Sequence, residues 1–242
     1  MMKHDKIMKS ITFLVAILVA SMMTMMVSAQ SADFELPDAS SVPGDAFYGF
    51  ERFLEDNFEV PWARLMQGKR GEALKRMQLA EERLAEMRAV CNGTDAVAIE
   101  QLQVRYEDHV QKAQALMNGS DTEALEEQIG ERLMNHVRVL TQLRKGVPEQ
   151  SRKGIDLALQ SSTRRFGEQV DQVAYRLSQM DGNSTEAIEL REKCNGWINQ
   201  TSDRITEWEA VKERTPGQGE DVDIEIPFDP AALRDKTKRG RN

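Results

Sequence analysis

Apolar side chains recur at intervals of seven residues over long segments with few helix breakers, and this spacing constrains the fold more than any other feature. The clearest run places Leu159, Phe166, Val173 and Met180 seven residues apart. Such an interval keeps side chains on one face of an α-helix, and antiparallel helices bury such faces against one another. No stretch gives the regular alternation of a β-sheet. The pattern therefore predicts an all-α fold.

Turn-forming residues divide this pattern into about six helices. We expect antiparallel hairpins that form an elongated helical bundle over residues 45–214. The expected ranges are about 46–58, 61–91, 95–117, 121–145, a fifth helix that ends at Met180, and 184–213. Aromatic residues gather between Phe47 and Trp62, in the first of these segments and at the start of the second. Because they follow helical spacing, we expect them to belong to the core rather than to a ligand cage.

The first 29 residues have the regions of a secretory signal peptide. Three lysines precede an uncharged segment from Ile11 to Val27, and Val27-Ser28-Ala29 is typical of a cleavage site. We expect cleavage there, a polar leader over residues 30–44, and a mature protein that is secreted or held at the cell surface. The alternative is an uncleaved anchor, because a segment of this length can just span a bilayer. Only in that case would the chain contact a membrane.

The composition excludes several classes of function. The formal net charge is −8, from 32 basic and 40 acidic residues, whereas nucleic-acid binding needs a cationic face. No glycine-rich phosphate loop, Gly-x-Ser-x-Gly motif or His-Glu-x-x-His motif is present. We therefore expect no catalytic residue, no cofactor and no metal site. His109 and His136 fall on apolar stripes, so we expect them to be buried structural residues.

Four sequons agree with an exported chain. They begin at Asn92, Asn118, Asn183 and Asn199. Three coincide with expected turns, where asparagine and a following serine or threonine also serve as turn and capping residues. Asn199 has no such explanation. We expect glycosylation at some of these sites if the host modifies asparagine.

Cys91 and Cys194 leave two alternatives open. An exported protein with two cysteines favours a disulfide, whereas buried thiols on apolar stripes are the other interpretation. In a simple up-and-down bundle the two sulfurs would lie roughly 20 Å apart along the axis, which a disulfide cannot bridge. The bond and the simple bundle therefore exclude each other. We favour the bond together with a departure from the simple bundle.

The last 28 residues differ from the helical region. Residues 218–228 alternate acidic and apolar side chains, and residues 234–242 are mostly basic. Together with proline and glycine, these opposed charge blocks predict a disordered, flexible charged tail over residues 215–242.

Several stretches resemble a prokaryotic secreted family, the domain of unknown function 5667. Val42-Pro-Gly-Asp-Ala-Phe-Tyr-Gly-Phe-Glu-Arg52 resembles the turn that leads into the family's first helix. Leu79-Ala-Glu-Glu-Arg-Leu-Ala-Glu86 resembles the Ala-Glu-x-Arg-Leu-x-Glu run of its next helix. His136-Val-Arg-Val-Leu140 and Val147-Pro-Glu-Gln150 extend the similarity, which covers about residues 40–165. The resemblance implies an exported helical domain and supplies no catalytic residue.

Two hypotheses about function follow from these features. The first is a non-enzymatic structural or interaction module of the cell envelope or the extracellular space, which binds an envelope or extracellular protein not identified by the sequence. The second is an extracytoplasmic chaperone-like or ligand-binding helical module. The Leu-Thr-x-x-Gln repeats of small periplasmic stress chaperones are not matched, since only Leu140-Thr141-Gln142 is present.

Overall fold

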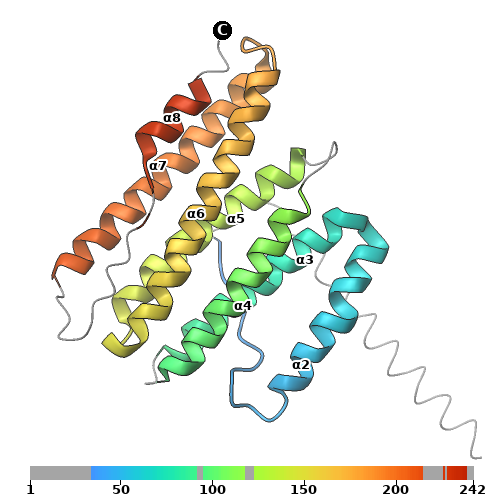
Figure 1. The fold of residues 1–242 in the computed structure, drawn as a ribbon, viewed down its shortest axis with the longest axis vertical. Coiled ribbons are helices and arrows are strands. Elements are labelled where there is room, and N and C mark those ends of the chain that lie inside the picture. Colours follow the sequence, from blue (N-terminus) through green and yellow to red (C-terminus); the bar gives the residue numbers. More distant parts are fainter. Residues whose placement is uncertain (1–33, 92–94, 118–122, 215–225, 227, 239–242) are drawn as a thin grey trace, which may run out of the picture. The chain divides into compact units, whose positions relative to one another are not determined.

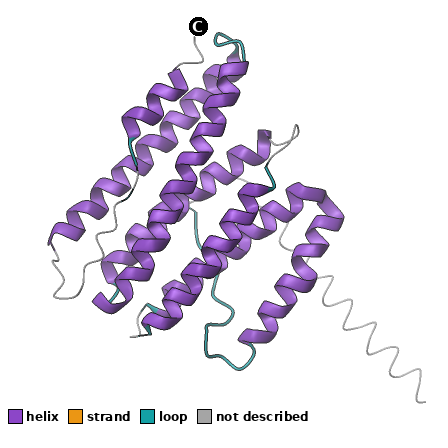
Figure 2. Ribbon diagram, viewed as in Figure 1, coloured by secondary structure: helices purple, strands orange, loops and turns teal. Residues whose placement is uncertain are grey.

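The computed structural model describes residues 34–91, 95–117, 123–214, 226 and 228–238. It divides the chain into Met1–Glu35 and Leu36–Asn242, and the described helices all lie in the second unit. Within the described residues all regular structure is helical and no strand is present (Figure 2). The fold is therefore all-α, as predicted. The predicted signal peptide lies outside the described residues. Residues 34–44 of the predicted leader are described and contain a bend and a turn but no helix or strand.

The helices correspond closely to the expected segments. They are α2 (Tyr48–Leu54), the π-helical turn η1 (Glu55–Glu59), α3 (Val60–Val90), α4 (Ala96–Ala115), α5 (Glu123–Gly146), α6 (Glu149–Gln179), α7 (Thr185–Arg214) and α8 (Pro230–Lys238). Capping residues define several starts. The Asp95 carboxylate accepts a hydrogen bond from the N–H of Ala98 at 2.9 Å, and Ser184 caps α7 in the same way.

Consecutive helices pair as hairpins, and the hairpins stack in two layers (Figure 1). The pairs are α3 with α4, α5 with α6, and α7 with α8. In one layer α5 contacts both α3 and α7, and in the other α6 contacts both α4 and α8. The expected antiparallel hairpins are confirmed, and they stack side by side instead of closing into one simple up-and-down bundle.

The seven-residue stripes form the core between the layers. Leu159, Phe166 and Val173 of α6 are completely buried. Close helix contact also depends on a small residue in α5, because a Cβ at Gly130 would lie 2.8 Å from the Trp197 ring of α7. The spacing that predicted the helices thus also identified the faces through which α6 packs.

Helix α8 corrects the expectation of a flexible tail over residues 215–242. Residues 230–238 form a helix that packs on α6 and α7, and Leu233 and Thr237 are buried on one face of it. The Asp229 carboxylate caps the helix by accepting from two backbone N–H groups, and Pro230 is its first residue. The Asp-Pro pair was therefore a start signal in the sequence, although the opposed charge blocks obscured it. Residues 215–225 lie outside the described residues.

A buried polar network joins three helices at the centre of the stack. The Tyr106 hydroxyl of α4 lies 3.0 Å from His136 Nδ1 of α5 and 2.6 Å from Ser162 Oγ of α6. All three side chains are completely buried. His109 is buried as well, and burial lowers its pKa to about 4. Both histidines are therefore buried residues, as predicted.

We predict that Tyr106→Phe lowers the free energy of unfolding by about 1–3 kcal/mol, because it removes the buried hydrogen bonds of this hydroxyl with His136 and Ser162. Guanidinium denaturation followed by circular dichroism measures this change. Tyr175→Phe is the matched control, since the Tyr175 side chain is 71% exposed. Equal stability of the two variants would contradict a stabilising role for the network.

Candidate functional site

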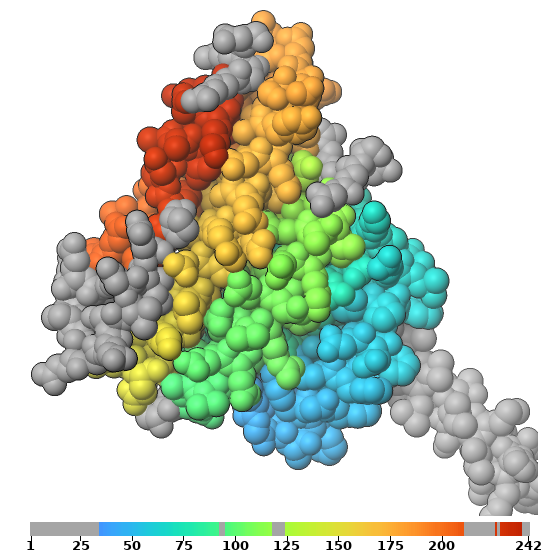
Figure 3. Space-filling model, viewed as in Figure 1, coloured from blue at the N-terminus to red at the C-terminus, as the bar shows by residue number. Residues whose placement is uncertain are grey.

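The chain begins its helical region with an arm that folds back on α3. We define the arm as residues 47–67, which comprise the residue that caps α2, then α2, η1 and the first turns of α3. Helix α3 bends sharply at Gly68, whose φ of 64° and ψ of −152° suit glycine alone. The arm then lies along the remainder of α3 and beside α4 (Figures 1 and 3).

Charged side chains hold the arm to α3. Arg52 and Glu55 of the arm and Arg83 and Glu86 of α3 form a closed cycle, which we call the four-charge cluster. Glu55 lies 2.6 Å from Arg52 and 2.9 Å from Arg83, and Glu86 lies 3.3 Å from Arg52 and 3.2 Å from Arg83. Each side chain in the cluster is at most 8% exposed. At this cluster the contact between arm and body is thus ionic, where a helix pair is ordinarily apolar.

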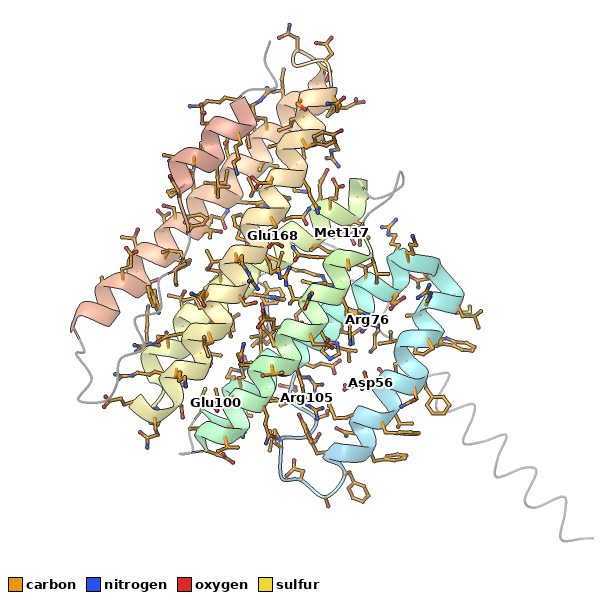
Figure 4. The ribbon with its side chains drawn as sticks, viewed as in Figure 1. Asp56, Arg76, Glu100, Arg105, Met117 and Glu168 are labelled. Carbon is orange, nitrogen blue, oxygen red and sulfur yellow. The ribbon has the colours of Figure 1, made fainter. Side chains whose placement is uncertain are left out.

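Further polar contacts extend this attachment along the arm. The Tyr48 hydroxyl donates to a Glu86 carboxylate oxygen at 3.1 Å, and the guanidinium of Arg105 lies 5.6 Å from the Tyr48 ring centre. Figure 4 shows Arg105 on α4, on the side near the arm. Toward the bend, Lys75 pairs with Glu59 at 2.6 Å. The inner face of the arm is therefore largely polar, although it also includes the buried apolar residue Val60.

Burial shifts the titration of the carboxyl groups in the cluster. Burial raises the pKa of Glu55 to about 8 and that of Glu86 to about 7, and the neighbouring arginine Arg52 opposes both shifts. Burial also raises the pKa of Glu82, which lies 3.5 Å from Arg83. The attachment of the arm therefore contains acids that titrate near neutral pH.

The outer face of the arm is apolar and exposed. Its large apolar side chains are 53–76% exposed: Phe47, Phe50, Phe53, Phe58, Trp62, Leu65 and Met66. We call these seven residues the aromatic face. Among the described residues, four other large apolar side chains are 42–71% exposed, and they are scattered over α4, α6 and α7, so exposed apolar surface concentrates on the arm. Figure 4 shows aromatic rings projecting from the arm on the side away from α3. The prediction that these aromatics belong to the core was wrong, because charged residues occupy the inner face.

The π-helical turn keeps the aromatic face in register. A π-turn adds about one residue to a helical turn, so residues five apart across it lie on the same side. Phe53 and Phe58 are five apart, and their ring centres lie 6.2 Å from each other in an edge-to-face arrangement. Without this turn, Phe58 and Trp62 would rotate away from Phe50 and Phe53. The turn thus joins two short aromatic stripes into one.

The two cysteines are free and buried. Cys91 ends α3, whereas Cys194 lies within α7, and these helices are not among the pairs that pack together. The disulfide that we favoured is therefore absent from the structure, although the fold does depart from a simple bundle. Burial raises the pKa of Cys91 to about 11 and that of Cys194 to about 12, which keeps both thiols protonated.

The predicted glycosylation sites differ in their surroundings. Asn183 is exposed in the turn between α6 and α7. Asn199 lies within α7, where its carbonyl oxygen accepts hydrogen bonds from Arg234 of α8 at 2.7 and 3.1 Å. Thr201 of the same sequon is completely buried. A glycan on Asn199 would thus compete with the docking of α8. Asn92 and Asn118 lie outside the described residues.

The described part of the chain lacks two further features. There, no group of three or more His, Cys, Asp or Glu side chains is placed to hold a metal ion. In the same residues, no helix has both the length and the apolar character needed to cross a membrane.

We predict that the melting temperature falls as pH rises from 6.5 to 8. Glu55 and Glu86 have raised pKa values, so the stability that they contribute is present at low pH and is lost as pH rises through about 7 and about 8. His109 acts in the opposite sense but below its unperturbed pKa of 6.5. Thermal unfolding followed by circular dichroism measures the slope.

The variant that tests this assignment is Glu55→Gln with Glu86→Gln, which should show a much smaller change between pH 6.5 and 8 than the wild-type protein. Glu207→Gln is the control, because neighbouring Lys145 and Arg204 lower the pKa of that exposed carboxyl group. A wild-type slope in the double variant would assign the pH dependence to other groups.

Comparison with known proteins identifies part of the chain. No curated protein and no solved structure matches it. Residues 40–150 match the family described as Domain of unknown function (DUF5667). Tyr48, Arg83 and Glu86, which hold the arm in place, lie in the two stretches that carry the resemblance in the sequence. Residues 40–150, which contain the arm, α3, α4 and α5, are therefore a DUF5667 domain.

Proposed function

We propose that this protein is an exported, non-enzymatic interaction module that binds a protein surface through the aromatic face of its arm. One observation carries the proposal: the arm buries the charged side chains of Arg52 and Glu55 on its inner face and exposes seven large apolar side chains on its outer face. On the inner face, Glu55 and Glu86 each pair with both Arg52 and Arg83. The exposed face therefore has no role in holding the arm on α3, and association with another surface would remove it from water.

The size of the aromatic face suits a protein–protein interface. Large apolar side chains contribute about 150–250 Å² each, so seven of them at the observed exposure present on the order of 800–1,000 Å². The largest apolar patch on a typical monomer is about 300–600 Å². A standard interface buries about 800 Å² on each partner.

Charge indicates the chemistry of that partner. Of the exposed acidic residues, Asp45 precedes the arm and Asp56 lies near its middle. Of the exposed basic residues, Arg64 lies near the end of the arm, and Lys69 and Arg70 follow it. A matching surface is apolar at its centre, basic at one end and acidic at the other. An anionic lipid surface lacks this polarity, and the net charge of −8 opposes binding to it. The proposed partner is therefore a protein.

Export is supported by the signal-like residues 1–29 and by the resemblance to a secreted family. We predict that the protein recovered from the medium or envelope begins at Gln30. Intact-mass measurement decides this point. A native start at Met1 or Met2 on membrane-bound protein would identify the segment as an anchor instead.

We predict that Phe50→Ser with Trp62→Ser abolishes association in the envelope or medium fraction. Chemical crosslinking of that fraction, followed by immunoblotting, should give a discrete larger species for the wild-type protein and at least tenfold less for the variant. Val104→Ser with Tyr175→Ser is the matched control, since these exposed apolar side chains lie on α4 and α6. Equal yields from both variants would refute the aromatic face as the binding surface.

The same exposed face also favours the chaperone-like alternative, because unfolded clients bind to apolar surfaces. The two functions differ in an aggregation assay. A chaperone suppresses aggregation of a denatured client at substoichiometric amounts, and the Phe50→Ser, Trp62→Ser variant would lose this effect. Under the proposed function, wild-type protein has no such effect.

A further inference from the structure

We infer that the partner of the aromatic face is the same face of a second copy of this chain, with the two arms antiparallel. This inference rests on the proposed function and specifies its partner. Three independent features of the arm support it: the position of the arm in the stack, its area and its charge distribution.

The arm covers one end of a stack of helical hairpins. In stacked helical arrays the terminal layer ordinarily presents a polar outer face, which ends the array and keeps it soluble. Here the outer layer next to α3 and α4 presents the aromatic face instead. Further helices can pack against such an apolar layer. The arm of a second copy has the apolar surface that this packing requires.

The area agrees with a two-fold dimer. Two faces of about 800–1,000 Å² would bury roughly 1,600–2,000 Å² in total, within the range of stable interfaces. The arm has about 20 residues, which at 1.5 Å per residue is about 30 Å. Because both arms have the same length, their aromatic faces overlap completely in an isologous pair.

The charges at the two ends of the arm favour the antiparallel orientation. A two-fold axis beside Phe58 places Phe50 opposite Leu65 of the second copy, and Phe53 opposite its Trp62. The same axis brings Asp45 to the end that carries Lys69 and Arg70. A parallel pair would instead place acidic ends together and basic ends together, which is unfavourable.

The first test measures self-association of purified protein. The full chain is expressed with its own N-terminal segment, purified in the form that the cell processes, and examined by sedimentation equilibrium. We expect a monomer–dimer equilibrium whose dissociation constant rises about 100-fold or more in Phe53→Asp, because the charge enters the centre of both halves of the interface. Tyr175→Asp, which changes an exposed aromatic residue outside the arm, should leave the constant unchanged.

The second test determines orientation by cysteine crosslinking. Phe58→Cys lies beside the axis and should form a disulfide-linked dimer under mild oxidation. Phe50→Cys should not, because in the antiparallel pair its two copies are about 20 Å apart, beyond the Cα separation of about 7 Å that a disulfide permits. The native Cys91 and Cys194 are buried and do not compete. Efficient crosslinking of Phe50→Cys would overturn the antiparallel arrangement.

Charge reversal provides a control that does not touch the aromatic face. Asp45→Lys should weaken the dimer, and adding Lys69→Asp and Arg70→Asp to the same chain should restore it. Failure of restoration would also count against the antiparallel pair.

The outcomes separate this inference from the proposed function. A purified protein that stays monomeric up to 100 µM would overturn the second copy as partner. If crosslinking in the envelope fraction still depended on Phe50 and Trp62, the proposed function would stand with a different protein. If neither association depended on the aromatic face, both proposals would fail.

Discussion

The four-charge cluster determines which face of the arm packs on α3 and which face is exposed to solvent. Burial of ion pairs carries a large desolvation cost, and well-packed apolar residues in the same place are often as stabilising or more so. An arm attached by its aromatic side chains would therefore hold at least as firmly. Instead Arg52 and Glu55 face Arg83 and Glu86, and the apolar side chains are left on the outside. An attachment through ion pairs leaves the apolar side chains of the outer face free to bind another surface.

Two connections behind the arm have similar sequences. Residues 117–126 and 180–189 have similar sequences, 63 residues apart. In the structure the first of these segments spans the junction of α4 with α5, and the second spans the junction of α6 with α7. Both segments therefore connect one hairpin to the next, where similar turn and capping residues recur. The similarity between residues 87–93 and 190–196 has no such basis, since one ends α3 and the other lies within α7.

Periodicity predicted the helices but not the direction in which every face points. The stripe of Leu159, Phe166 and Val173 faces the core, and the stripe of Phe47, Phe50 and Phe58 faces outward, although both follow helical spacing. Spacing shows that side chains share a face and contains no information about what lies opposite. The missing signal was the second stripe of the arm, where Tyr48, Arg52 and Glu55 repeat at intervals that suit contact with Arg83 and Glu86. Ion pairs between segments 28 or more residues apart follow from tertiary structure, so sequence spacing alone did not reveal them.

The boundary of the DUF5667 match has a structural consequence for the whole chain. The match ends at residue 150, just after α6 begins, yet helices α4 and α5 both pack against α6. The Tyr106 hydroxyl lies within the matched region, and its partner Ser162 lies beyond it. Arg144 of α5 likewise pairs with Asp156 of α6 at 2.9 Å, and Trp208 of α7 donates to the same carboxylate. These buried contacts make α6 and α7 part of the core that supports the family's helices. The unit that folds around the arm is therefore larger than the matched segment, and the arm occupies the end of that unit farthest along the stack from α7 and α8.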